Sequence, residues 1–301
     1  MANTVPDFSI DSILGAADGM TLSFLAKTYP ALASSVSTPI YLVAVLYWAV
    51  FGIKVYAGHA GLQWKDFLGK TVLTVAAFAV LSWSGLAQIV YGMFANFMES
   101  AAATILAGKS TDSMINALWS GMNHVANILM SKDVFKLAMV IQGLVLFILN
   151  CVMFTLAVGY MTYAKIGLCI TMLLLPLFVG FFFFEQTRQW GMNWINKMMN
   201  FAFIYILSIA IIRFGFALFG KAIDDAGKIV DVVAEQGVAA GAMQGVLVSN
   251  QLAYFYLVEG VLIFFLLGVR SWAAALTSSA SSGTGTLVMM ARMAISKGTA
   301  K

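Results

Sequence analysis

Six long apolar runs are the feature of this chain that most restricts how it folds. They cover residues 40–55, 68–90, 137–163, 166–184, 201–219 and 252–269. A helix needs about 20 apolar residues to cross a hydrocarbon core roughly 30 Å thick. Lipid offers the backbone no hydrogen-bond partners, and the alternating pattern of a membrane barrel is missing from the sequence. The runs therefore predict an all-α, polytopic helical membrane protein.

The composition agrees with this class. Hydrophobic residues make up 61% of the 301 residues and charged residues 10%, against about 25% charged in a typical soluble domain. The net charge of +4 is weak evidence for a nucleic-acid partner, because basic residues beside spans usually set orientation or contact anionic lipid. His59 and His124 are isolated and match no metal-ligand spacing. We expect one membrane domain without a metal or cofactor.

We divide the chain into an amphipathic N-terminal segment (1–35), a transmembrane domain (36–276) and a basic tail (277–301). The first segment lacks the basic start of a cleavable signal peptide, and Pro6-Asp7 indicates a helix start. Two interpretations of this segment stay open: a helix in the membrane interface, or a helix packed on the transmembrane bundle. Its apolar positions recur at helical spacing: Ile10, Ile13, Leu14, Ala17, Thr21, Phe24 and Leu25.

Two connections between the runs are predicted to lie outside the cytoplasm, near 91–136 and 220–251. The first contains an amphipathic helix, because Met114, Leu118, Met122, Val125 and Leu129 recur every three or four residues. The second contains GVAAGAMQG. There Gly237, Gly241 and Gly245 form two small-xxx-small steps, which favour close helix packing. A flexible glycine-containing loop is the alternative.

The loop charges predict the orientation of the chain. Asp7, Asp11 and Asp18 place the N-terminus outside, and a tail with several basic and no acidic residues belongs inside. Opposite sides for the two ends require an odd number of crossings. We therefore predict five crossings plus a broken segment at 166–184, where Pro176 removes a helical hydrogen bond. Six crossings remain the alternative.

The two cysteines are predicted to stay unpaired. Cys151 and Cys169 lie in consecutive apolar runs. If these runs form a hairpin about Lys165, the two side chains differ in depth by roughly 15 Å. That separation is far beyond the reach of a disulfide.

No catalytic motif is present in the sequence, so we expect the protein not to be an enzyme. The informative ionisable residues are Arg213 and Glu259, since charges within apolar spans usually face a partner or a wet cavity. Each lies eight residues from an end of the connection between the last two runs. We predict that they form an ion pair, which either fixes helix register or lines a conduit.

Residues 175–195 read LPLFVGFFFFEQTRQWGMNWI. This block resembles the polytopic inner-membrane subunit of bacterial type IV secretion and conjugation machines, in which a Pro-[LI]-Phe stretch leads to a Thr-Arg pair and a Trp-containing helix start. A weaker likeness covers Tyr47-Trp48 through Gly52 and Lys54. The residues that we single out as structural or translocation candidates in and near the block are Pro176, Glu185, Thr187, Arg188, Trp190 and Trp194. Trp190 and Trp194, four apart, are expected on one helix face at the membrane interface.

The resemblance implies a non-enzymatic, multi-pass subunit of the bacterial inner membrane that supports translocation of DNA or protein and pilus biogenesis. It implies a ring of copies that contacts the minor pilin or stalk, the bitopic inner-membrane scaffold subunits, the ATPase apparatus and membrane lipid, with transient contact to the DNA or protein substrate. The N-terminus would be periplasmic and the C-terminus cytoplasmic. Two alternatives remain: an independent secondary transporter, and an assembly scaffold without a conduit.

Overall fold

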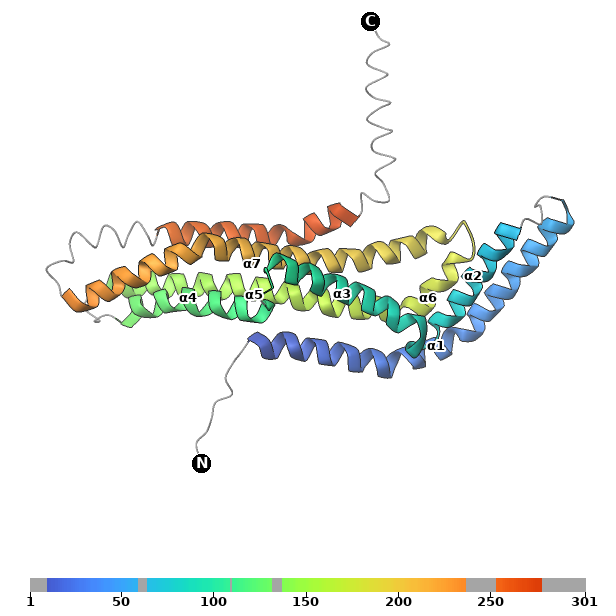
Figure 1. Ribbon diagram of the computed structural model, residues 1–301, viewed down its shortest axis with the longest axis horizontal. Helices are drawn as coiled ribbons and strands as arrows, with labels where there is room; N and C mark the ends of the chain where they lie inside the picture. The colour runs from blue at the N-terminus through green and yellow to red at the C-terminus, as the bar shows by residue number, and fades with distance from the viewer. Residues whose placement is uncertain (1–9, 59–63, 109, 132–136, 237–252, 278–301) are drawn as a thin grey trace, which may run out of the picture. The chain divides into compact units, whose positions relative to one another are not determined.

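A computed structural model describes residues 10–58, 64–108, 110–131, 137–236 and 253–277. Every regular element in these ranges is a helix, and they contain no strand (Figure 1). The predicted all-α class is confirmed. Pro6-Asp7, His59 and residues 278–301 of the basic tail lie outside these ranges.

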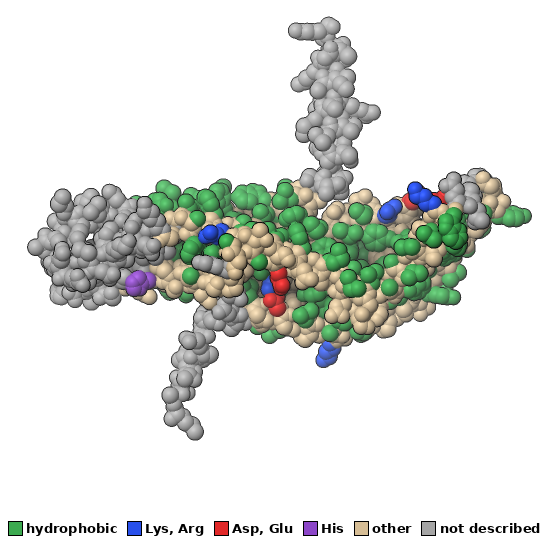
Figure 2. Space-filling model, in the orientation of Figure 1, with side chains coloured by type: hydrophobic (Ala, Val, Ile, Leu, Met, Phe, Trp, Pro, Cys, Tyr) green, Lys and Arg blue, Asp and Glu red, His purple; other side chains and the backbone are tan. Residues whose placement is uncertain are grey.

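Four described helices are long and apolar enough to cross a membrane. A fifth candidate exists if the bent pair Trp64–Val80 and Trp83–Ile105 is one span. The four are Leu14–Tyr56, Val140–Leu173, Arg188–Leu218 and Ala253–Thr277. Large apolar side chains such as Met20, Ile141 and Phe264 remain exposed on them, as lipid-facing surfaces require. Figure 2 shows hydrophobic side chains spread over the visible face, with few charged groups among them. The chain is a polytopic helical membrane protein.

Two apolar runs that we predicted as separate segments form one helix. Helix α5 extends over Leu137–Leu173 and passes through Lys165 without a break. The predicted hairpin about Lys165 is therefore wrong. Cys151 and Cys169 lie on the same helix, and both are free thiols. The lysine does not end the helix, because a charged side chain removes no backbone hydrogen bond.

The chain bends sharply between the second and third helices, at a place where the sequence predicted no break. Helices α2 (Trp64–Val80) and α3 (Gln88–Ile105) are joined by the short π-helical turn η1 (Trp83–Ala87), and the two arms of this pair meet at 95°. The run 166–184 is also broken, as predicted: around Pro176 the chain leaves α5 and forms two short elements, α6 (Leu175–Val179) and η2 (Gly180–Phe182). Helix α7 (Arg188–Gln236) follows. Pro176 lies in the first turn of α6, where its missing N–H costs no hydrogen bond.

The chain divides into two compact units. Of the described residues, the first contains those within 10–18, 98–164 and 204–270, and the second contains those within 19–97, 165–203 and 271–277. Helix α1 (Ile10–Tyr56) supplies residues to both units, as do α5 and α7. Helix α1 also joins the predicted amphipathic segment to the first apolar run, and it contains Pro30 and Pro39.

In the first unit, helix α4 (Thr111–Ser131) confirms the helix expected from the periodicity of the first connection. Its Trp119 packs edge-to-face on Phe154 of α5, with 4.9 Å between ring centroids. The hydroxyl of Tyr256 in the helix Ala253–Thr277 donates a 2.8 Å hydrogen bond to the carbonyl oxygen of Gln142. Three residues of the predicted apolar stripe, Met114, Leu118 and Met122, are buried in this unit, together with Ile115, Asn123 and Ala126 of α4.

In the second unit, α2 runs beside the last turns of α1 (Figure 1). The indole nitrogen of Trp48 donates a 3.1 Å hydrogen bond to the Thr74 hydroxyl. At the bend, the buried Tyr29 hydroxyl donates a 2.7 Å hydrogen bond to the carbonyl oxygen of Val80. Gly85 is needed within the turn, because a Cβ there would lie 2.7 Å from the carbonyl oxygen of Ala79.

Candidate functional site

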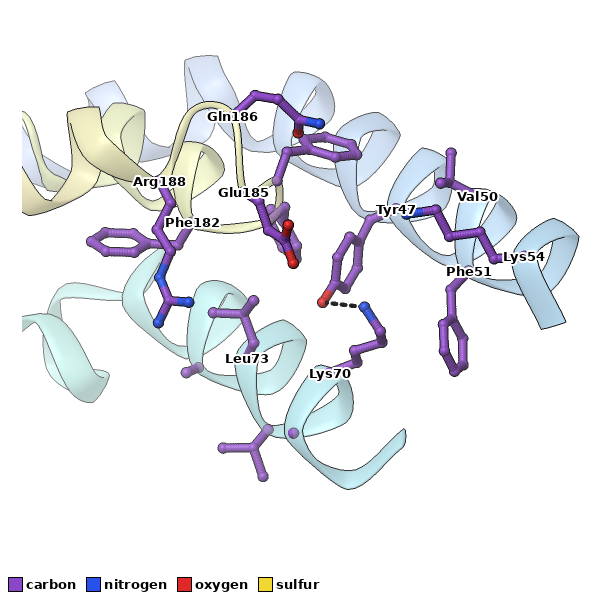
Figure 3. Close-up of a pocket in the computed structure, with 15 residues that line it drawn as sticks. Tyr47, Val50, Phe51, Lys54, Lys70, Leu73, Phe182, Glu185, Gln186 and Arg188 are labelled. Atoms are coloured by element: carbon purple, nitrogen blue, oxygen red, sulfur yellow. Dashed lines mark hydrogen bonds between the residues drawn. The ribbon is translucent and has the colours of Figure 1, made fainter. Parts of the chain in front are cut away.

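A cavity of about 530 Å³ in the second unit is lined by both segments that carried the sequence resemblance. Tyr47 and Lys54 come from α1, whereas Glu185 and Arg188 come from the turn before α7 and from its first residue. Helix α2 adds Lys70, which the sequence did not single out as a site residue. Figure 3 shows these side chains around one space.

Tyr47 is the centre of the contacts in this cavity. Its ring packs against Phe183 and Phe184, with centroid separations of 5.3 and 5.9 Å. The Lys70 ammonium donates a 3.1 Å hydrogen bond to the Tyr47 hydroxyl (Figure 3) and lies 4.4 Å from the centroid of the Tyr47 ring. The same ammonium is 4.9 Å from the ring centroid of Phe51. Tyr47 thus holds α1, α2 and the 183–184 segment together.

The turn that carries Glu185 is fixed by its own hydrogen bonds. The Thr187 hydroxyl donates to the carbonyl oxygen of Phe181 at 2.9 Å and to that of Phe184 at 3.3 Å. Phe181 in turn packs edge-to-face on Trp190, at 5.0 Å between centroids. The Thr-Arg pair of the sequence motif is therefore the point where the turn closes and α7 begins.

The two tryptophans of the motif have different surroundings. Trp190 is 57% exposed, as expected for an interfacial indole, but Trp194 is only 5% exposed. The indole N–H of Trp194 donates a 2.7 Å hydrogen bond to the carbonyl oxygen of Thr171. Trp194 thus fastens α7 to the end of α5. Pro176, a few residues after the end of α5, is buried in α6.

Three cations and one carboxylate line the cavity. Lys54, Arg188 and Glu185 are exposed and Lys70 is half-buried. Among the described residues, no salt bridge joins any of the three cations to Glu185. The site therefore combines an excess of positive charge with aromatic walls. Such a site can hold an anion beside an apolar group.

Arg213 and Glu259 belong to the first unit, and the structure does not pair them. Glu259 is 0% exposed, and neither carboxylate oxygen has a hydrogen-bond partner among the described residues. Arg213 on α7 is half-buried. Our prediction of an ion pair is wrong in this structure, because equal distances from a connection set depth along a helix and not the face on which a side chain lies.

Other candidates fall outside what the structure describes. Gly237, Gly241 and Gly245 lie in the range 237–252, beyond the described end of α7 at Gln236. Two residues with structural roles, Tyr29 at the bend and Lys70 in the cavity, were not singled out from the sequence. Tyr29 could have been found by extending the helical spacing of Leu25 by one turn, whereas Lys70 becomes visible only once α1 and α2 are paired.

Comparison with known proteins gives consistent matches. The family model for TrbL/VirB6 plasmid conjugal transfer proteins matches residues 44–257. The chain is 24% identical over 191 residues to the type IV secretion system protein VirB6 of Bartonella quintana, and 23% identical over 199 residues to that of Bartonella henselae. Each match covers 60% of this chain and 58% of the relative. The chain thus spans little more than half the length of the curated relatives.

Proposed function

Because this chain belongs to the TrbL/VirB6 family of plasmid conjugal transfer proteins, we propose that it is a non-enzymatic inner-membrane subunit of a type IV secretion or conjugation machine. In this role it forms part of the channel or assembly platform. It supports translocation of DNA or protein substrates and biogenesis of the pilus.

One observation carries the proposal beyond family membership. The 175–195 block and the Tyr47–Lys54 segment, separated by more than 120 residues of sequence, line a common cavity. Both segments lie within the residues that the family model matches. A shared cavity supports a common role for them at one end of the membrane-spanning helices.

The assembly we propose is a ring of copies of this chain. The copies contact the minor pilin or stalk, the bitopic inner-membrane scaffold subunits and the ATPase apparatus, and they meet the transported substrate only transiently. The ATPases supply the energy. We further propose a periplasmic N-terminus and a cytoplasmic C-terminus, with connections near 91–136 and 220–251 outside the cytoplasm. Loop charges support this orientation.

A plasmid-transfer assay tests the function. In a strain lacking its own copy of the gene, the full chain should restore transfer. Arg188→Ala and Tyr47→Ala should lower the transfer frequency at least about tenfold, because each removes a cavity group. Lys65→Ala is the matched control, since Lys65 is an exposed cation on α2 that does not line the cavity. Membrane levels of each variant are measured in parallel. Normal transfer without the chain would refute the proposed function.

A further inference from the structure

We propose that the cavity around Tyr47 binds a phosphate group, presented by the headgroup of an anionic phospholipid. The ligand class follows from three properties of the cavity: its charge, its walls and its position at the ends of the spans. Binding of lipid is a property of the isolated chain, and it does not depend on the secretion role.

The charge of the cavity favours an anion. Lys54, Lys70 and Arg188 face one opposing carboxylate, Glu185, and no ion pair among the described residues neutralises them. Figure 3 shows that the three cations come from three separate elements, α1, α2 and α7. Charge-assisted hydrogen bonds from lysine and arginine to phosphate oxygens are among the stronger polar contacts in proteins. A phosphate group matches this set of donors.

The walls of the cavity favour an amphipathic ligand over a free ion. Phe51 and Phe183 are buried, and Tyr47 is half-buried between them and the polar groups. The volume of about 530 Å³ is larger than a phosphate group needs. The aromatic side chains of the cavity can contact the glycerol and the first methylenes of a lipid while the cations bind its phosphate.

The position of the cavity is that of a membrane headgroup layer. Lys54 is two residues before the end of the candidate span Leu14–Tyr56, and Arg188 is the first residue of Arg188–Leu218. Two exposed tryptophans lie near helix starts, Trp64 as the first residue of α2 and Trp190 as the third residue of α7, as is typical of interfacial belts. A lipid phosphate is therefore the anion that this end of the helices meets at the highest local concentration.

The test measures thermal unfolding of the purified full chain in detergent micelles. A ligand that binds only the folded state raises the midpoint temperature. We titrate phosphatidylglycerol into the wild-type chain and into Lys54→Gln, Lys70→Gln, Arg188→Gln and Lys65→Gln. The concentration that gives half of the maximal shift should rise about tenfold for the first three variants. It should stay unchanged for Lys65→Gln. Phosphatidylcholine should give a smaller shift, because its choline cancels the phosphate charge.

A change in the opposite direction makes the test sharper. Glu185→Gln removes the carboxylate that opposes the anion, so it should bind phosphatidylglycerol several-fold more tightly than the wild type. Lys54→Gln keeps the test valid if Lys70→Gln disturbs folding through Tyr47, because Lys54 makes no hydrogen bond or ion pair with another described residue.

Two results would overturn the proposal. The first is equal lipid dependence for the wild type, Lys54→Gln and Glu185→Gln, which would mean that lipid acts on the surface as a whole. The second arises if inorganic phosphate alone, at the same concentrations, gives a shift that depends on Lys54 and Lys70. The ligand would then be soluble phosphate and not a lipid headgroup.

Discussion

The hydroxyl of Tyr29 donates a 2.7 Å hydrogen bond to the carbonyl oxygen of Val80, fifty-one residues along the chain. Val80 is the last residue of α2, where the helix ends and its carbonyl has no partner within the helix. The Tyr29 ring also packs on Trp83, the first residue after the break, with 5.4 Å between centroids. A single side chain of α1 therefore supplies a hydrogen bond to the last carbonyl of α2 and packs against the first residue after the break between α2 and α3.

We expect Tyr29→Phe to lower the free energy of unfolding by about 1–2 kcal/mol, because it leaves a buried carbonyl unsatisfied while keeping the ring. Chemical unfolding in mixed micelles measures the change. Tyr41→Phe is the control: Tyr41 lies on the same helix, is exposed, and has a ring contact with Phe78 that phenylalanine keeps. Equal losses for the two variants would contradict the role given to the Tyr29 hydroxyl.

Gly167 is predicted to be needed for the contact between α5 and α7. A Cβ at this position would overlap the ring of Phe201, so Gly167→Ala should destabilise the protein by about 1–3 kcal/mol through overpacking. Gly159→Ala on the same helix has no atom within 4 Å of the added Cβ and should leave stability unchanged or slightly raised. Thermal unfolding of both variants decides the matter, and a neutral Gly167→Ala would refute the close approach.

Glu259 should reduce the stability of the fold. Its two carboxylate oxygens are buried without a hydrogen bond among the described residues, so Glu259→Leu should raise the free energy of unfolding by about 1–3 kcal/mol. If the acid serves secretion, the same variant should lower plasmid transfer. Arg213→Ala should act independently, and the double change should equal the sum of the single changes within about 0.5 kcal/mol. A clearly non-additive change in the free energy of unfolding would show that Arg213 and Glu259 interact.

The orientation is tested by thiol labelling in a chain with Cys151→Ser and Cys169→Ser. Cysteines placed at Ser9 and Ser296 are exposed to an impermeant reagent in intact spheroplasts. The N-terminal position should be labelled and the tail protected until the membrane is permeabilised, because positive residues are retained on the cytoplasmic side. Labelling of the tail alone would show the reverse orientation.

Assembly of copies through the glycine steps gives a further expectation. Gly241→Leu should fill the groove predicted for GVAAGAMQG and weaken the homo-oligomer while leaving membrane insertion intact. Crosslinking in membranes measures the change, with Gly92→Ala as a control because a Cβ there meets no atom within 4 Å. A crosslinking ladder that matches the wild type would argue against this interface.

Periodic patterns predicted helices well, whereas isolated residues predicted breaks unevenly: the break near Pro176 is present, but the one expected at Lys165 is not. The stripe of Met114, Leu118 and Met122 identified α4 because burial of one face requires that spacing. Lys165, Pro30 and Pro39 stand inside continuous helices, so neither a charge nor a proline was sufficient to end one. The bend after Val80 depends on Tyr29 and on the space beside Gly85. Such long-range contacts leave no local pattern.

Only part of the cavity was predictable from the sequence. Glu185, Thr187 and Arg188 stood out because the 175–195 block resembles a known family, and Tyr47 and Lys54 because they belong to a second, weaker likeness to it. Pairing of α1 with α2, which brings Lys70 to Tyr47, depends on side-chain contacts over 23 residues. The prediction that Arg213 pairs with Glu259 was wrong for a similar reason. The depth of a residue in a span can be counted along the sequence, but the sequence does not show which faces of two helices are turned toward each other.

The enclosed position of Glu259 also bears on how the protein is made. During synthesis, each helix leaves the translocon into lipid. Glu259 is the seventh of the 25 residues in Ala253–Thr277, and an ionisable side chain within an apolar span disfavours that step. In the finished protein Glu259 is 0% exposed, so it never faces lipid once its neighbours are in place. The helix Ala253–Thr277 should therefore partition into the bilayer against helices already inserted and not alone. We therefore expect insertion of this helix, the last that the structure describes, to depend on completion of the bundle, so that a chain with a damaged α5 or α7 should fail at insertion before it could reach an assembly.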